Sequence, residues 1–233
     1  MSADRDTVLA DVDAVRDGIA SAAERSGRGA DDVRLVAIGK TVPAETIRWI
    51  VEVGVLDVGE NYVKELAAKR DALRAHADVR WHFVGALQSH TAHLVAADAD
   101  IVHTLAPGRA VERLSRRAAE AGRRIPALIQ VDFTASRNGV GPEGLEAFAE
   151  EVAGLPGLEL AGLMTLPPEP KAPEDSRPYF RRLPQLAEDL RGTHPGLREL
   201  SMGMSLDYEV AVLEGATMVR VGTALFGARQ HPM

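Results

Sequence analysis

Apolar and polar positions along this chain follow two periods in turn. Eight short runs are rich in β-branched and other apolar residues, as buried strands are, and they cover residues 34–38, 55–58, 81–84, 100–103, 127–132, 158–163, 199–202 and 218–221. The segments between them have helical spacing, at residues 45–53, 62–75, 92–97, 109–121, 144–154, 178–191 and 207–214. Strands that are separated by helices need parallel crossovers.

Eight such units close naturally into a barrel, so we predict a (β/α)8 TIM barrel. An open doubly wound sheet is the alternative, but no GxGxxG motif follows the first strand. We expect one domain over residues 1–233, in which an amphipathic leading helix within residues 1–30 precedes a barrel over residues 31–227. The apolar face of the leading helix carries Val8, Leu9, Val12, Val15, Ile19 and Ala22.

Segment 166–178 follows the sixth predicted strand and holds five prolines. Proline removes a backbone donor and fixes φ, so this composition predicts a loop. The loop would lie at the C-terminal face, where barrels build their active sites, so a lid or rim role is the alternative to a plain connection.

The composition of the chain excludes several kinds of functional site and partner. The formal net charge is -7, and the chain has no cysteine. A net acidic chain opposes the phosphate attraction on which nucleic-acid binding depends, and we interpret the arginines between residues 113 and 124 as a solvated helix face. The lack of cysteine excludes disulfides, thiolate metal sites and cysteine nucleophiles. Since the chain has no membrane-length apolar run and no signal peptide, we expect a cytoplasmic protein with no membrane partner.

The first predicted strand is followed by Lys40, at the end of the barrel where functional groups gather. A buried ammonium must be paired or have its pKa lowered by desolvation, and a neutral amine can attack an aldehyde. Taken alone, a lysine in this position more often extends to water.

The second and third strand ends are also polar. Glu60, Asn61 and Tyr62 are consecutive, and we expect Glu60 or Asn61 to cap the following helix. His82 alternates with apolar neighbours, as a satisfied core histidine does. His90 and His93 are spaced like a metal-binding pair, but no further ligand is evident nearby, so we predict no metal site.

Small residues follow the seventh and eighth strands. The first turn holds Ser201, Gly203 and Ser205, and the second holds Gly222 and Thr223. Glycine lets a ligand approach the backbone, and barrels commonly hold a phosphate at these two loops. Each turn alone fits a tight connection without a ligand, whereas the two together, facing a lysine from the first strand, favour phosphate binding.

A phosphate cradle beside a nucleophilic lysine suits a phosphorylated aldehyde. Pyridoxal 5′-phosphate (PLP) meets both demands, and the substrate of a sugar-phosphate aldolase does too. Arg220 on the eighth strand favours PLP, because a guanidinium against the pyridine nitrogen would keep that nitrogen unprotonated and weaken the ring as an electron sink.

Six segments resemble, in order, the motifs of the pyridoxal phosphate homeostasis protein family, the PROSC-like proteins, which share the barrel of alanine racemase. They are residues 37–41, 59–63, 81–89, 162–165, 200–207 and 219–227, and the resemblance spans nearly the whole chain. It implies that Lys40 holds PLP as a Schiff base and that Arg220 approaches the pyridine nitrogen. The other residues that it implies around the cofactor are Ser201, Gly203, Gly222 and Thr223 at the phosphate and Asn61, Met202 and His82 at the remaining wall. The family usually has serine, histidine and asparagine at the positions of Gly39, Ala86 and His90.

The resemblance also bears on activity. Alanine racemase-like enzymes take a second acid/base from a C-terminal β domain of a partner subunit, and only about ten residues follow Thr223 here, so we expect no such domain and no catalytic residue. The resemblance implies a carrier or regulator of PLP in vitamin B6 homeostasis, with PLP-dependent apoenzymes as candidate recipients, in the form of a monomer or weak dimer. A weak PLP-dependent amino-acid racemase, using Tyr62 or a water as second base, is the alternative.

Overall fold

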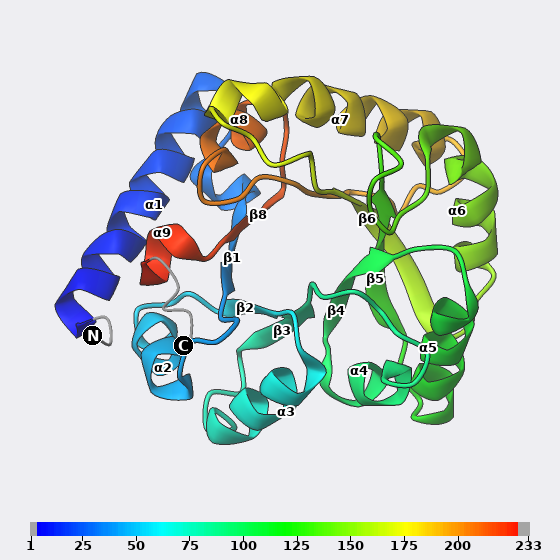
Figure 1. Cartoon of the computed structure of the whole chain (residues 1–233), viewed down its shortest axis with the longest axis horizontal. Helices are drawn as coiled ribbons and strands as arrows, with labels where there is room; N and C mark the ends of the chain where they lie inside the picture. The colour runs from blue at the N-terminus through cyan, green and yellow to red at the C-terminus, as the bar shows by residue number, and fades with distance from the viewer. Residues whose placement is uncertain (1–3, 228–233) are drawn as a thin grey trace.

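The computed structural model describes residues 4–227, and over them the strands form one closed parallel barrel (Figure 1). The strands are β1 (Arg34–Ile38), β2 (Asp57–Glu60), β3 (Arg80–Phe83), β4 (Ile101–Leu105), β5 (Ile125–Val131), β6 (Leu158–Thr165), β7 (Glu199–Ser201) and β8 (Met218–Val221). Each strand pairs with the next, and β1 pairs with β8. The predicted TIM barrel is confirmed, and the pairing of β1 with β8 excludes the open sheet.

Helices surround the barrel (Figure 1). They are α1 (Arg5–Arg25), α2 (Ala44–Glu52), α3 (Val63–Ala72), α4 (Ala92–Asp98), α5 (Arg109–Glu120), α6 (Leu145–Ala153), α7 (Arg177–Arg191), α8 (Tyr208–Leu213) and α9 (Thr223–Phe226), with 3-10 turns η1 (Ala30–Asp32), η2 (Pro142–Gly144) and η3 (Pro173–Ser176). Sequence reasoning misses α9, because four residues are too few to show a helical period. In the described part of the chain, no helix is both long and apolar enough to cross a membrane.

The extra N-terminal helix is confirmed as α1, which lies along α2, α8 and α9 on the outside of the barrel (Figure 1). Asp4 caps it, since its carboxylate accepts hydrogen bonds from the Asp6 N–H at 3.4 Å and the Thr7 hydroxyl at 3.0 Å. The side chains that α1 buries are Val8, Val12, Val15, Ile19, Ala22 and Ala23. Most of the predicted apolar face is therefore buried against the neighbouring helices.

The proline-rich segment 166–178 is fixed at its far end. Ser176 is buried, and its hydroxyl donates to Asp207 at 2.6 Å. Asp207 also accepts the N–H of Met204 at 2.7 Å. The loop after β6 is thus tied to the turn after β7, so the two form one rim of the barrel.

The inside of the barrel is more polar than a barrel filled with branched aliphatic side chains. Strand alternation points every second side chain inward. Arg34 and Glu199 form an ion pair at the N-terminal end of β1 and β7, and a small apolar cluster holds Ile101, Leu128 and Met164. The main apolar core lies instead between the strands and the helices. The remaining interior is left to polar side chains that reach toward the C-terminal mouth.

Candidate functional site

Lys40 follows β1 and reaches the C-terminal mouth of the barrel. Its Nζ lies 5.0 Å from the ring centroid of Tyr62, and Tyr62 is 50% exposed. Among residues 4–227, no carboxylate oxygen lies within the 4.0 Å of an ion pair with Lys40. The amine is therefore half-buried over an aromatic face and has no ion-pair partner in this part of the chain.

The backbone on both sides of Lys40 is held by α3. Lys69 Nζ donates to the carbonyl of Gly39 at 2.6 Å, and Glu65 accepts the Thr41 N–H at 2.8 Å. Lys69 and Glu65 are also joined to each other at 3.0 Å. Thr41 has φ of 64°, a left-handed conformation that costs a non-glycine residue about 1–3 kcal/mol. These bonds stabilise the strained turn and so fix the direction in which Lys40 leaves the strand.

Glu60 lies behind this turn and is fully buried. Its Oε1 accepts a hydrogen bond from Lys69 at 2.7 Å, whereas Oε2 has no partner among the described residues. Burial raises the pKa of Glu60 to about 7, although Lys69 acts to lower it. The prediction that Glu60 or Asn61 caps the next helix is wrong. The N-cap of α3 is Tyr62 and has no side-chain cap, because Glu60 turns to Lys69 instead.

The turns after β7 and β8 meet at the mouth. The Ser205 hydroxyl accepts the N–H of Gly222 at 3.2 Å and the N–H of Ala224 at 3.1 Å. Gly203 has φ of 90°, and a Cβ at this position would lie 2.5 Å from the Cβ of Ala211. This turn therefore needs glycine. Two backbone donors that converge on one oxygen are the donor set that an anion such as phosphate takes.

Arg220 on β8 is a buried cation. Its Nη1 donates to Ser201 Oγ at 2.6 Å, and its Nη2 donates to the carbonyl of Thr165 at 3.0 Å. Burial lowers the pKa of Arg220 to about 10, and the charge of Asp207 acts in the opposite direction. Both acceptors are neutral and engage only two of the donors of a guanidinium, so the cation keeps further donors for a ligand.

The other predicted site residues lie at different depths. Asn61 is half-buried at the mouth, and Thr223 is exposed there. His82 and Ser201 are fully buried inside the barrel, with their polar atoms hydrogen-bonded. The Met202 side chain lies in the main apolar core. Direct ligand contact by His82, Ser201 and Met202 stays a prediction.

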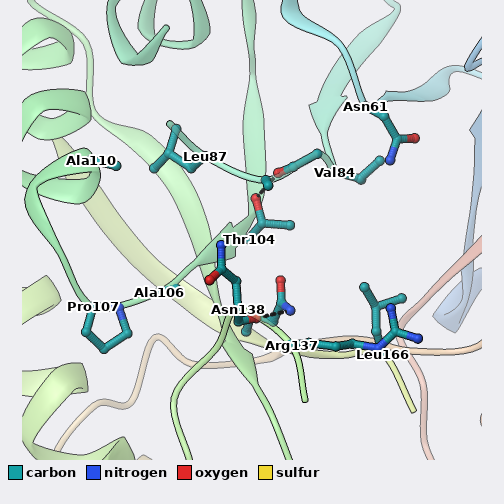
Figure 2. A pocket seen from close by; sticks show the side chains of 13 residues that line it. Asn61, Val84, Leu87, Thr104, Ala106, Pro107, Ala110, Arg137, Asn138 and Leu166 are labelled. Carbon is teal, nitrogen blue, oxygen red and sulfur yellow. Dashed lines mark hydrogen bonds between the residues drawn. The ribbon is translucent and has the colours of Figure 1, made fainter. Parts of the chain in front are cut away.

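A cavity of about 430 Å³ opens at the mouth beside Asn61 (Figure 2). Its lining comes from the C-terminal ends of β4 and β5, the loops after β2 to β6 and the start of α5: Asn61, Val84, Gly85, Ala86, Leu87, Thr104, Ala106, Pro107, Ala110, Gln130, Arg137, Asn138 and Leu166. This volume suits a small molecule, and polar and apolar side chains share the walls.

His90 and His93 are exposed and line a shallow depression with three arginines, Arg113, Arg116 and Arg117. Guanidinium groups would repel a metal cation from this place. Over residues 4–227, no group of three or more His, Cys, Asp or Glu side chains is arranged to hold a metal ion.

Sequence reasoning misses three residues that the structure connects to this region through hydrogen bonds. Lys69 belongs to a helical pattern in which a lysine is normally solvated. Asp57 and His103 are polar residues within strands that the sequence predicts, and in the structure their side chains face the inside of the barrel. A polar residue within an apolar strand is the one available signal in the sequence. Which other polar residue it contacts becomes clear only from the register of the closed barrel.

Comparison with known proteins points to one family. The family model described as alanine racemase, N-terminal domain, matches residues 10–230. A pyridoxal phosphate homeostasis protein of Aquifex aeolicus is 40% identical over 220 residues, which cover 93% of this chain and 96% of the relative. A protein of the same name from Escherichia coli is 38% identical over 230 residues, covering 93% and 94%. The solved structure of PipY from Synechococcus elongatus, with PLP bound, matches with a TM-score of 0.79 at 36% identity and covers 84% of this chain and 93% of that one.

Replacing Glu60 with glutamine is expected to change how stability depends on pH. A carboxyl group with a pKa raised by folding stabilises the protein fully below its unfolded pKa and loses this contribution as the pH rises through the folded pKa. Between pH 4.5 and 7, the wild type should therefore lose up to about 3 kcal/mol of unfolding free energy relative to Glu60→Gln. Denaturant unfolding at a series of pH values measures the difference.

Glu65→Gln is a control of opposite sign. Partial burial acts to raise the pKa of Glu65, but the Thr41 N–H and Lys69 together lower it. The wild type should thus be more stable than Glu65→Gln at neutral pH, and this advantage should fade as the pH falls. Parallel pH profiles for the wild type and Glu60→Gln would show that Glu60 ionises as an ordinary carboxyl group.

Proposed function

The chain belongs to the alanine racemase N-terminal domain family and, within it, to the pyridoxal phosphate homeostasis proteins, and from this membership we propose that it binds PLP as a Schiff base on Lys40 and acts as a PLP carrier. One observation carries the proposal. The neighbouring strands β1 and β8 and the turns after them carry an amine without an ion-pair partner in the described chain, two converging backbone donors and a buried guanidinium.

The surroundings of Lys40 support its role as the anchoring amine. PLP supplies an electrophilic aldehyde conjugated to a pyridine ring. The Tyr62 ring keeps the amine at the mouth, and the bonds of Lys69 and Glu65 to the adjacent backbone limit where it can point. Asn61, next to Tyr62 in the chain, lines the cavity at the mouth and is proposed to contact the cofactor.

The turns after β7 and β8 support phosphate binding. The N–H groups of Gly222 and Ala224 already converge on an oxygen atom, and Thr223 adds a hydroxyl group at the rim. Gly203 allows the neighbouring turn its left-handed backbone and its close packing against α8. The Ser201 hydroxyl is engaged with Arg220, so we propose that Ser201, with His82 and Met202, supports the wall from behind.

The charge of Arg220 supports binding over catalysis. Its pKa of about 10 leaves it protonated at neutral pH. A cationic donor would make the pyridine nitrogen an acceptor and keep it unprotonated, which weakens the ring as a sink for electrons. A ring held in this way is suited to storage and delivery.

Exposure at the mouth supports exchange with other proteins. Tyr62 is half exposed and Thr223 is exposed, so a bound cofactor would stay within reach from outside. We propose PLP-dependent apoenzymes as recipients, a monomer or weak dimer as the working form, and the cytoplasm as its location. The names of the relatives agree with a role in PLP homeostasis.

Trapping with borohydride tests the Schiff base. Reduction of the PLP-loaded protein should abolish its visible absorbance and add a pyridoxyl group to the peptide that contains Lys40, as measured by peptide mass spectrometry. Lys40→Ala should lose this adduct, whereas Lys64→Ala, on the exposed side of α3, should keep it. A wild-type protein that stays colourless after incubation with excess PLP and removal of the unbound PLP would contradict the proposed cofactor.

Transfer kinetics test the carrier role. If the recipient takes PLP directly from the open mouth, activation of a PLP-dependent apoenzyme by the loaded protein should speed up as the apoenzyme concentration rises. If the cofactor must first dissociate, the rate will level off at the dissociation rate measured with a small-molecule PLP scavenger. The second result would reduce the protein to a passive reservoir.

The racemase alternative is favoured by one observation, the position of the Tyr62 ring at 5.0 Å from the Lys40 amine. In the loaded protein, the carrier proposal predicts solvent deuterium exchange at Cα of amino acids no faster than with free PLP, as followed by NMR. Rapid exchange in the wild type that falls at least about tenfold in Tyr62→Phe would establish Tyr62 as an acid/base and favour the racemase.

A further inference from the structure

A line of buried hydrogen bonds crosses the inside of the barrel. Asp57 Oδ1 lies 2.8 Å from His82 Nε2, and His82 Nδ1 lies 2.8 Å from His103 Nε2. His103 Nδ1 lies 2.9 Å from Ser201 Oγ, which accepts from Arg220 at 2.6 Å. All five residues are buried, and they come from β2, β3, β4, β7 and β8. The line therefore links the N-terminal end of the barrel to the candidate site.

The protons in this line have one possible arrangement when both imidazoles are neutral. Arg220 can only donate, and the Asp57 carboxylate can only accept. His82 must then carry its proton on Nε2 and accept at Nδ1 from the Nε2–H of His103. His103 accepts at Nδ1 from the Ser201 hydroxyl, which accepts from Arg220. Every bond thus donates toward Asp57, and the single Ser201 proton is committed to His103.

Burial keeps both imidazoles neutral. It lowers the pKa of His82, although Asp57 acts to raise it, and it lowers the pKa of His103 well below its ordinary value. The charged groups facing the pair are Asp57 on β2, Arg34 on β1 with its partner Glu199 on β7, Arg80 on β3 and Arg220 on β8. The arginines in this set disfavour a second proton on either ring.

The line anchors Arg220 without a carboxylate in contact. Among residues 4–227, no acidic oxygen lies within 4.0 Å of its guanidinium, and its acceptors are the Ser201 hydroxyl and the Thr165 carbonyl. The negative end of the line is Asp57, whose Oδ2 accepts from the partly exposed Arg80 at 2.5 Å. A carboxylate beside Arg220 would compete with a ligand for its N–H groups. A neutral anchor leaves those groups and the charge available to a ligand.

We propose that His82 and His103 are positioning residues that act through Ser201 to hold Arg220 as a cationic donor toward the pyridine nitrogen of the cofactor. This inference rests on the proposed PLP site. This role requires no contact between either imidazole and the cofactor, because His103 reaches Arg220 through Ser201. Breaking the line frees Arg220 to turn away, so the ring nitrogen of PLP loses its donor. Lys40 and the N–H groups of Gly222 and Ala224 are unchanged, so PLP still binds.

The proton arrangement is tested without cofactor. In the full chain with 15N-labelled histidine, long-range 1H–15N correlation spectra at neutral pH should show His82 and His103 as neutral Nε2–H tautomers, with any titration displaced below the ordinary histidine pKa. The loss of each signal in His82→Asn and His103→Gln assigns it. An Nδ1–H tautomer at either residue, or titration near the ordinary histidine pKa, would overturn the line.

Two variants at one position test the link to Arg220. His103→Leu removes both of its bonds, whereas His103→Gln keeps a donor toward His82 but gives Ser201 no acceptor at the Nδ1 position. Both should weaken PLP binding about tenfold, as one weakened charge-assisted hydrogen bond predicts. Both should also shift the 15N resonance of PLP labelled at the ring nitrogen. A merely structural role predicts instead that affinity follows stability, with the better-satisfied His103→Gln binding like the wild type.

Ser115→Ala is the matched control, because Ser115 is buried on α5 and accepts one hydrogen bond from the Gly157 N–H at 3.1 Å. It should lower stability and leave both PLP readouts unchanged. If the His103 variants bind PLP with wild-type affinity and an unshifted 15N resonance, the positioning role is wrong and the proposed PLP site stands. If the wild type binds no PLP, the proposed function fails and the role toward the pyridine nitrogen fails with it.

Discussion

A guanidinium enclosed in a parallel barrel has to find its acceptors on neighbouring strands, because water does not reach it and strand alternation decides which side chains face inward. Arg220 meets this constraint with a hydroxyl and a carbonyl, and the hydroxyl is held in turn by two histidines. These inward positions are occupied by polar residues where a barrel of this kind normally has aliphatic ones. The upper interior is thus organised around the buried charge of Arg220.

A second polar group, on the other side of the strands, organises the first turn of the site. Glu60 on β2 accepts a hydrogen bond from Lys69 on α3, and Lys69 also donates to the Gly39 carbonyl, next to Lys40. The inner line and this outer pair do not touch the same atoms, yet each ends beside a group that the cofactor would need. The mouth is therefore built from two separate supports, one for the amine and one for the guanidinium.

The sequence is enough to predict the fold and the end of the barrel at which the candidate site is expected, because both predictions depend on local patterns. Apolar periodicity predicts each strand and the helices between them, and small residues after β7 and β8 mark a turn where backbone donors converge. What it misses depends on pairing between distant segments. Glu60 looks like a helix cap until Lys69 is placed beside it, and His103 has no apparent partner until the barrel brings it to Ser201, 98 positions away. Likewise, the strand alternation that turns Ser201 inward sends Met202 to the helical layer.

The Ser205 hydroxyl gives the turn after β8 a property of its own. Its oxygen already accepts the N–H groups of Gly222 and Ala224. An incoming anion would have to replace this hydroxyl as the acceptor, because neither N–H group is without a partner beforehand. The net gain in binding free energy is therefore smaller than the number of new hydrogen bonds suggests. When the anion leaves, the same hydroxyl accepts the two hydrogen bonds again, which lowers the free-energy barrier to release of the anion. Such a turn binds an anion less tightly and releases it more readily, as a site must if its ligand is to be passed on.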